Sequence, residues 1–472
     1  MRTIVWFRGK DLRISDHAPL RDAIRAGEVI PLFVLDPYFF APERAQRLPH
    51  RMQFLLESLA SLEKNIERLG SRLVLVEGKS TEVVPALASR WKADRVVAHR
   101  WVEPFARERD ERVAAALGDR FALYEGETLL PPGTVRTGDD KPFSVYTPFA
   151  RAVRRSLHVS EPEPAPKRLP ALPDIEAPRA PLPTLESLGI ERNPNLLEGG
   201  ERAGRARLDA FVRDRLAGYA SARDRLDEAG TSRLSADLKF GTVSVRTVWS
   251  RVAAADAPKE DIEKLTNELL WREFTHHTLW DRPNLLSEPF RADFQGFPWK
   301  DDAAWLEAWK SGHTGYPVVD ASARQLLGEG YVHNRARMIS ASFLTKHLGI
   351  SYKRGEAHYL AFLTDGDWAQ NNSGWQWSAG CGCDAQPYFR VFNPVTQGER
   401  YDPEGGYVRR WVPELAKLPN KFIHSPWLAP PDVLRAAGVR LGETYPRPIV
   451  DHAQARERFL TTAKAHLGRD RP

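Results

Sequence analysis

The first 130 residues alternate short β-branched runs with segments of helical periodicity. Strand-like runs lie at residues 3–8, 29–35, 72–76, 95–99 and 121–124. Between them, the stretches RMQFLLESLASLEKNIERLG and STEVVPALASRW carry apolar residues at helical spacing. Strands that alternate with helices in this way form βαβ units with a parallel sheet. We therefore expect an N-terminal α/β, Rossmann-like parallel-sheet domain over residues 1–130.

A proline-rich stretch follows this domain. Eight prolines occur in the 22 residues from Pro162 to Pro183, a density typical of a stiff, extended connector. We place an interdomain connector over residues 131–200. Beyond it, helical patterns dominate, and eleven of the 14 tryptophans lie between Trp249 and Trp427. We expect residues 201–472 to form an all-helical C-terminal domain that holds the aromatic chemistry.

Composition excludes several classes of protein. The two cysteines, Cys381 and Cys383, are too few for a disulfide framework or a four-cysteine metal site. His276, His277 and His333 lack a metal-ligand pattern, so we expect no metal. The charged N-terminus contains neither a signal peptide nor a membrane span, which predicts a cytoplasmic protein without membrane contact. The net charge of +6 gives weak support for an anionic partner.

Two predicted helices present polar faces. Around 264–280, the residues Glu268, Trp271, Arg272 and Thr275 share one face, which could be a binding surface or a solvated face with a Glu–Arg pair. The second helix repeats this spacing with Asn334, Arg337, Met338 and Ala341, and surface arginines on an amphipathic helix are the alternative.

Two further stretches offer groups for a large polar ligand. Thr231 to Ser235 supply hydroxyls at a probable helix start, where they could hold phosphate or act as a simple N-cap, and Tyr219 could add a hydroxyl. In DGDWAQNNSGWQWSAGCGCD, Asp365 to Asp367 and Asn371 provide acceptors and an amide beside Trp375 and Trp377. This mixture predicts a flat, partly polar cavity rather than a plain apolar core.

Eight motifs in order resemble the FAD-containing photolyase/cryptochrome family over nearly the whole chain. They include WFRGKDLRISDHAPL, GTSRLSADLKFG, NELLWREF, GYPVVDASARQL, VHNRARMISASFL and DGDWAQNNSGWQW. The first of these lacks the G-x-G-x-x-G dinucleotide fingerprint of a Rossmann domain. The resemblance implies that the helical domain binds FAD. It also implies that reduced flavin drives the light-dependent repair of DNA photoproducts.

The family pattern assigns roles to single residues. FAD contacts are implied for Tyr219, Thr231, Ser232, Arg233, Leu234, Ser235, Arg272, Arg337, Asp365, Gly366, Asp367 and Asn371. Asn371 would face the flavin N5, and Arg337 would pair with Asp365. Catalytic roles are implied for Glu268, Asn334, Met338 and Asn371, and contacts to DNA or the lesion for Arg223, Glu268, Trp271, Asn334, Arg335, Trp377, Arg390 and Gln397.

Asn371 matches the photolyases rather than the cryptochromes, and Asn334 and Met338 match the cyclobutane-dimer enzymes. The resemblance therefore implies DNA containing cyclobutane pyrimidine dimers as the partner of a monomeric enzyme. An electron relay is implied through Trp375, Tyr352 and Trp299, in which Tyr352 replaces the usual central tryptophan. FVLDP and EPFARERD favour a deazaflavin or FMN over methenyltetrahydrofolate as a second, antenna chromophore. Two alternatives are a cryptochrome-type photoreceptor without repair activity, for which the chain offers no long C-terminal tail, and a dark flavin oxidoreductase, for which it offers no nicotinamide fingerprint.

Overall fold

The structure is a computed structural model that describes residues 1–178 and 180–468. These residues form two compact units, each assembled from separate stretches of the chain. Unit 1 comprises Met1–Gly218, Ser232–Pro283 and Thr364–Ala369. Unit 2 comprises Tyr219–Thr231, Asn284–Leu363 and Gln370–Pro472. The predicted boundaries at residues 130 and 200 stay predictions.

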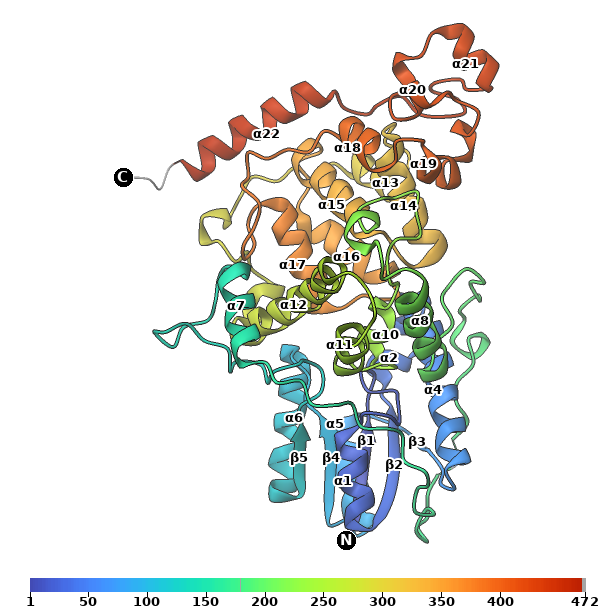
Figure 1. Cartoon of the computed structure of the whole chain (residues 1–472), viewed down its shortest axis with the longest axis vertical. Helices are drawn as coiled ribbons and strands as arrows, with labels where there is room; N and C mark the ends of the chain where they lie inside the picture. Colours follow the sequence, from blue (N-terminus) through green and yellow to red (C-terminus); the bar gives the residue numbers. More distant parts are fainter. Residues whose placement is uncertain (179, 469–472) are drawn as a thin grey trace. The chain divides into compact units, whose positions relative to one another are not determined.

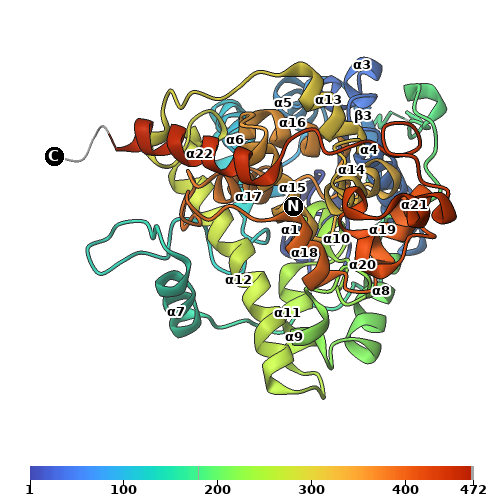
Figure 2. The ribbon, with the colours of Figure 1, turned by 90° about the horizontal axis from the view of Figure 1, so that it is seen from above.

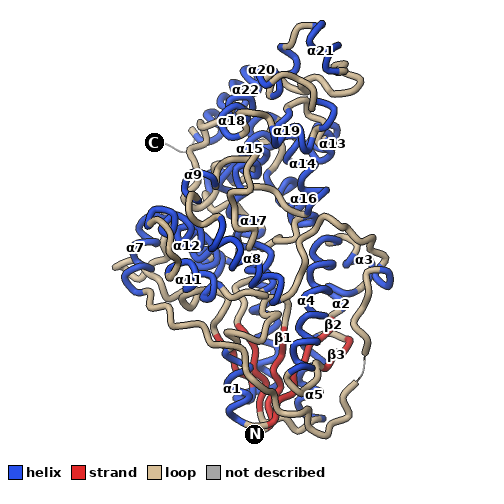
Figure 3. The backbone as a smooth tube through the Cα atoms, turned by 45° about the vertical axis from the view of Figure 1, so that its right-hand side comes forward, coloured by secondary structure: helices blue, strands red, loops and turns tan. Residues whose placement is uncertain are grey.

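Unit 1 is built on a five-stranded sheet, whose strands are red in Figure 3. The strand order is β3-β2-β1-β4-β5, and every pairing is parallel. The central strand is held on both sides, since Thr3 pairs with Val29 on one neighbour and with Arg95 on the other. The strands are β1 (Arg2–Phe7), β2 (Glu28–Leu35), β3 (Val74–Glu77), β4 (Arg95–His99) and β5 (Phe121–Tyr124). The predicted strands and the α/β class are confirmed.

Helices cover both faces of this sheet (Figure 1). Because side chains alternate across a strand, Val5 and Phe7 pack into one apolar cluster with Phe54, while Ile4 and Trp6 pack into another. The first cluster draws on α1 (Ala18–Ala26) and α4 (Pro49–Arg68), and the second on α5 (Ser80–Arg90) and α6 (Pro104–Leu117).

The rest of unit 1 is helical or extended. Among the described residues, Pro162 to Pro183 form neither helix nor strand, as their proline content predicts. The long helix α12 packs against α7 and α11 (Figure 2). The remaining helices of the unit are α2 (Pro37–Phe40), α3 (Pro42–Ala45), α7 (Tyr146–Ser156), α8 (Glu201–Asp214), α10 (Ser235–Phe240), α11 (Val245–Ala253) and α12 (Lys259–Asp281).

Unit 2 is helical around one apolar core. Trp309 lies at its centre, fully buried, and its indole N–H donates to Ser340 Oγ at 3.0 Å. The helices are α9 (Tyr219–Ala222), α13 (Ala303–Ser311), α14 (Pro317–Glu329), α15 (Asn334–Ser342), α16 (Tyr352–Phe362), α18 (Pro394–Tyr401), α19 (Gly406–Trp411), α20 (Asn420–Ile423), α21 (Pro431–Ala437) and α22 (His452–Leu467). Helix α17 (Trp368–Ala379) begins in unit 1 and continues in unit 2. The described residues contain no strand after Tyr124, so the helical prediction is confirmed.

None of the helices in the described part of the chain is long and apolar enough to span a membrane.

Candidate functional site

Unit 1 contains a cavity of about 440 Å³ at the carboxyl ends of its strands. Four stretches at the strand ends contribute to the lining. They are Trp6 to Gly9 at the end of β1, Asp36 to Phe40 after β2, Lys79 to Thr81 after β3 and Trp101 to Phe105 after β4. Ligands of open parallel sheets bind at this edge, where the chain crosses from one side of the sheet to the other. The predicted α/β domain therefore carries a binding site despite its missing glycine fingerprint.

The cavity wall combines aromatic rings with cations. The guanidinium groups of Arg8 and Arg109 both lie over the rings of Trp6 and Trp101, at 4.8–5.2 Å from the ring centroids. Arg8 also forms a buried ion pair with Asp110 at 2.5 Å. Its Nε and Nη2 are buried and have no hydrogen-bond partner among the described residues. Stacked, partly unsatisfied guanidinium groups suit a flat ligand that carries negative charge.

Trp368 belongs to this cavity wall. Its ring makes an edge contact with Phe105, at 6.0 Å between centroids, and lines the cavity. The preceding segment is tied to the same wall, because Arg51 Nη1 donates to the carbonyl oxygen of Gly366 at 3.2 Å. The sequence alone left Trp368 without a role, and its contacts place it on the sheet-containing unit rather than in the helical core.

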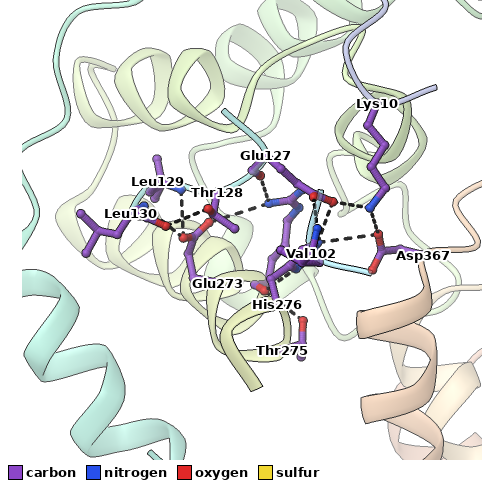
Figure 4. Close-up of polar contacts among 11 residues, drawn as sticks. Lys10, Val102, Glu127, Thr128, Leu129, Leu130, Glu273, Thr275, His276 and Asp367 are labelled. Atoms are coloured by element: carbon purple, nitrogen blue, oxygen red, sulfur yellow. Dashed lines mark hydrogen bonds and ion pairs between the residues drawn. The ribbon is translucent and has the colours of Figure 1, made fainter. Parts of the chain in front are cut away.

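A cluster of buried charges lies beside the cavity (Figure 4). The Lys10 ammonium forms ion pairs with Glu103, Glu127 and, at 3.3 Å, Asp367. His276 Nε2 lies 3.4 Å from Glu127 Oε1 and 3.7 Å from Asp367 Oδ2. The ligand atoms of Glu127, His276 and Asp367 are close enough together to hold a metal ion, but the Lys10 ammonium already supplies a positive charge to both carboxylates.

The charges of this cluster stabilise one another. Although burial opposes ionisation, the Lys10 ammonium and the His276 imidazolium hold the pKa of Asp367 well below its usual range. Burial would lower the pKa of His276, but the carboxylates of Asp367 and Glu127 outweigh that effect and raise it to about 9. His276 is therefore a buried imidazolium at neutral pH.

Helix α12 joins the cluster through Arg272. This guanidinium is 5% exposed, and its Nη1 donates to the carbonyl oxygen of Glu127 at 2.6 Å. Its Nε is buried without a hydrogen-bond partner in the described part of the chain. The structure thus brings together Arg272 and Asp367, two residues that the family resemblance assigns to FAD, whereas Thr275 only bonds back to the Arg272 carbonyl within the helix.

The outer part of the same helix presents Glu268 and Trp271. The Trp271 indole stacks on the ring of Tyr146 of α7, with centroids 3.7 Å apart and planes inclined by 7°. Tyr146 donates its hydroxyl hydrogen to the carbonyl oxygen of Asn267 at 2.9 Å. Burial, followed by the nearby Glu268 carboxylate, raises the pKa of Tyr146. The stack covers one face of the indole and holds its orientation.

Sequence reasoning missed Tyr146 because no local signal marks it. It stands 125 positions before Trp271, in the stretch predicted to be an interdomain connector. Within the stretch SVYTPF, only the aromatic side chain of Tyr146 indicates that it could stack on another ring.

Helix α15 of unit 2 carries the second predicted polar face. Asn334 is exposed at the first turn, and its Nδ2 lies 3.8 Å from the sulfur of Met338. Arg335 forms an ion pair with Asp224 at 3.0 Å, and its guanidinium lies 4.3 Å from the ring centroid of Tyr401. Arg337 donates from Nε to the Val332 carbonyl oxygen at 2.7 Å. The exposed Asn334 and the adjacent thioether form a continuous strip on the helix.

The predicted phosphate-binding residues lie in both units. In unit 2, Tyr219 is buried, Arg223 lies beside its ring, and the hydroxyls of Thr231 and Tyr331 are 3.3 Å apart. In unit 1, Ser232 Oγ accepts from the backbone N–H of Leu234 at 3.4 Å. Arg233 has a positive φ of 57°, which L-residues rarely adopt, so a tight local turn precedes Ser235 at the start of α10.

Asn371 is anchored by its amide nitrogen. Nδ2 donates to the carbonyl oxygen of Glu356 at 3.0 Å, and the neighbouring Asn372 donates to Glu356 Oε1, also at 3.0 Å. Burial raises the pKa of the Glu356 carboxyl to about 7. Because the Asn371 amide nitrogen already donates to Glu356, the carbonyl oxygen of the same side chain is the atom that can accept a hydrogen bond from a ligand.

The three residues of the predicted electron relay lie among packed aromatic rings in unit 2. Tyr352 and Trp299 meet edge to face with centroids 6.3 Å apart. Trp375 packs on Gly355, one turn from Tyr352 on α16, and touches Tyr359 at 5.1 Å and Trp309 at 5.9 Å. The Tyr352 hydroxyl is buried without a hydrogen-bond partner among the described residues, and burial raises its pKa.

The remaining predicted DNA contacts are Trp377, Arg390 and Gln397. Trp377 is partly buried on α17, whereas Arg390 is exposed. The Arg390 backbone is fixed because the buried Lys346 donates to its carbonyl oxygen at 2.9 Å. Gln397 Oε1 is buried and finds no hydrogen-bond partner within the described residues. Both cysteines are buried and form no disulfide, and burial raises the pKa of Cys381 to about 12.

The chain matches known families over both of its parts. Residues 3–170 match DNA photolyase, and residues 265–465 match the FAD binding domain of DNA photolyase. A deoxyribodipyrimidine photo-lyase of Agrobacterium fabrum is 40% identical over 473 residues, which cover 98% of this chain and 97% of that protein. The chain belongs to the photolyase/cryptochrome family.

Solved structures of this family have the same fold. A class III photolyase from Agrobacterium tumefaciens superposes with a TM-score of 0.93 at 39% identity, over 98% of this chain and 97% of that one. A cryptochrome from Synechocystis gives a TM-score of 0.90 at 31% identity, over 98% and 99% of the two chains. A photolyase from Sulfolobus tokodaii, solved with two FAD molecules, gives 0.84 at 29% identity, over 98% and 100%. The fold is therefore common to repair enzymes and a cryptochrome.

Proposed function

We propose that this protein is a light-driven enzyme that repairs cyclobutane pyrimidine dimers in DNA and uses FAD as its catalytic cofactor. The observation that carries the proposal is the 40% identity, over 98% of the chain, to a deoxyribodipyrimidine photo-lyase. The residue-level pattern agrees, because Asn371 is the type implied for photolyases, and Asn334 and Met338 are the types implied for the cyclobutane-dimer enzymes. The cryptochrome alternative retains the fold and the FAD site but performs no repair.

The phosphates of FAD would be held by one set of residues. Tyr219, Thr231, Ser232, Arg233 and Ser235 would contact its phosphates, because hydroxyls, a cation and a tight backbone turn match an anionic diphosphate. The chemistry of the residues fits this cofactor, since the buried Arg272 Nε lacks a protein partner among the described residues and a polar ligand would satisfy it.

The flavin ring would be held by a second set of residues. Asp365, Gly366 and Asp367 would contact the ribose and the isoalloxazine, and Arg337 would pair with Asp365. Asn371 would present its amide oxygen to the flavin N5. When bound and reduced, FAD would supply the light-driven electron transfer that splits the cyclobutane ring with no net redox change.

The lesion would be recognised outside the DNA helix. A dimer within duplex DNA must be flipped out, at a cost of a few kcal/mol that is lowest for damaged, poorly paired bases. Stacking of the flipped bases on Trp271 and Trp377 would offset this cost, at about 1–3 kcal/mol per base. Trp271 is suited to this role because Tyr146 already covers its other face. Glu268 and Asn334 would hydrogen-bond the dimer, and Met338 would pack against it.

Four residues would hold the DNA on either side of the lesion. Arg223, Arg335 and Arg390 would contact backbone phosphates, which fixes the register of the protein without reading the sequence. Gln397 would be a further contact to the DNA. Arg390 is exposed, and its backbone is held by Lys346. These contacts predict binding that weakens as salt is added.

The cavity in unit 1 would take the antenna chromophore. Its aromatic wall and the guanidinium groups of Arg8 and Arg109 match a flat anion, such as FMN or a deazaflavin. The absorption spectrum of the chromophore released by denaturation identifies it, and a folate-type spectrum would refute this assignment.

The repair activity is tested on a synthetic oligonucleotide with a single thymine dimer. The protein, reconstituted with FAD and fully reduced, should restore the undamaged strand under blue light and leave it unchanged in the dark. Chromatography of the oligonucleotide separates the two products. A protein that binds FAD and absorbs blue light, yet repairs no dimers when fully reduced, would support the cryptochrome alternative.

A further inference from the structure

Lys10 joins three segments of unit 1 that are far apart in the sequence. Its side chain is 3% exposed, and its ammonium contacts Glu103 after β4. It also contacts Glu127 after β5 and Asp367 in the segment Thr364–Ala369 (Figure 4). Lys10 and Asp367 are separated by 357 positions. The ammonium is therefore a buried cross-link between the edge of the sheet and that segment.

The ammonium makes the burial of three carboxylates possible. Glu103, Glu127 and Asp367 are at most 4% exposed at their side chains. Buried carboxylates at this distance repel one another unless cations or protons neutralise them. The other cations around the cluster are Arg51 of α4, Lys239 of α10, and Arg272 and His276 of α12. Only Lys10, among the described residues, forms an ion pair with all three carboxylates.

The segment that Lys10 contacts has a second tie to the unit. Arg51 holds the Gly366 carbonyl, and Trp368 lines the cavity. These contacts hold the middle of the Asp365–Asp367 stretch and the residue that follows it, but not the carboxylate of Asp367. That carboxylate meets Lys10 and His276, and of these two only the Lys10 ammonium also reaches the cavity wall, through Glu103.

We propose that Lys10 is a positioning residue, whose ammonium holds the Asp367 carboxylate, and with it the segment Thr364–Ala369, in the conformation that binds FAD. Lys10 acts through Asp367 and is not a catalytic residue. The inference rests on the proposed assignment of Asp365 to Asp367 to FAD. Through Glu103, the same contact anchors the flavin-binding segment to the wall of the cavity.

The experiment measures the affinity for FAD in the variant Lys10→Met. Apoprotein is titrated with FAD at pH 6 and pH 8, and binding is followed by flavin fluorescence. We expect a loss of at least about tenfold at pH 8, because a charge-assisted contact is removed. The loss should be smaller at pH 6, because protons can then replace the missing cation on the buried carboxylates. The wild-type affinity should vary less between the two pH values.

Three further variants make the result specific. Lys64→Met removes an exposed lysine of α4 and should leave the affinity unchanged. Lys10→Arg retains the cation and should recover most of the affinity. The double variant Lys10→Met/Glu103→Gln removes one negative charge together with the positive one, and should bind FAD more tightly than Lys10→Met. Circular dichroism shows whether Lys10→Met folds. If it does not, the FAD affinities of Lys10→Arg and of the double variant are compared instead, because both variants keep the positive and negative charges of the cluster in proportion.

The variant Asp367→Asn separates this inference from the proposed FAD site. If Asp367→Asn binds FAD like the wild type, the assignment of this segment to FAD is wrong. If Asp367→Asn weakens binding but folded Lys10→Met binds like the wild type at pH 8, the positioning role of Lys10 is overturned. An equal loss in Lys10→Met at both pH values would also overturn it, because the effect would then not depend on charge.

Discussion

The stack of Tyr146 on Trp271 holds the indole that would bind the lesion in one orientation. It predicts how much this orientation contributes to the affinity for dimer-containing DNA. In the variant Tyr146→Ala, Trp271 loses the ring 3.7 Å below it and can adopt other rotamers. Binding of a flipped dimer must then restore the stacking orientation. The cost of that step is bounded by the energy of the lost aromatic pair, about 0.5–1.5 kcal/mol beyond buried area.

This energy corresponds to a rise in the Kd for dimer-containing DNA of between about twofold and about tenfold. Fluorescence anisotropy with a labelled oligonucleotide that contains one thymine dimer measures the change. The same oligonucleotide without the dimer should bind both proteins equally, because its affinity comes from phosphate contacts.

A matched variant separates the ring from the hydroxyl. Tyr146→Phe retains the ring and removes the hydroxyl, which bonds the backbone carbonyl oxygen and the Oδ1 of Asn267, so it should bind dimer DNA like the wild type. The reasoning is refuted if Tyr146→Ala binds dimer DNA as tightly as the wild type. It is also refuted if damaged and undamaged DNA lose affinity equally, since the stack would then support the fold rather than the lesion site.

Three other predictions concern the relay, the charge cluster and the core. Tyr352→Trp should accelerate photoreduction of oxidised FAD, because the buried Tyr352 hydroxyl has no hydrogen-bond partner among the described residues to take its proton; an unchanged rate in flash photolysis would contradict the relay. The pKa of His276 is raised to about 9 from an unfolded value of 6.5, so its contribution to stability is complete below pH 6.5 and is lost as the pH rises through 9. Urea unfolding should show a loss on the order of 3 kcal/mol across this range, and His276→Gln should flatten the profile; equal slopes would argue against a buried imidazolium. Gly355→Ala should lower the free energy of unfolding by about 1–3 kcal/mol, because the added Cβ meets the Trp375 ring and the Leu344 side chain; Gly374→Ala, at an open position of α17, is the control, and equal stability of the two variants would show that the core adapts.

The sequence by itself determined the local structure and the family. Strands are encoded in runs of apolar, β-branched residues and helices in a period of 3.6, both of which are properties of neighbouring positions. The predicted runs 95–99 and 121–124 coincide with β4 and β5, and the predicted helix around 264–280 lies within α12. The motifs that carry the resemblance are likewise contiguous, so the chain's family could be predicted before the fold was known.

Only the tertiary structure decided which distant residues meet. Lys10 reaches Asp367, Tyr146 supports Trp271, and Trp368 lies in the cavity wall rather than in the helical core. Each of these contacts joins positions more than 100 residues apart. Neither periodicity nor local propensity predicts which residues meet at such separations. These contacts are selected by the free energy of burying aromatic rings and of pairing buried charges. That free energy is available only in the folded chain.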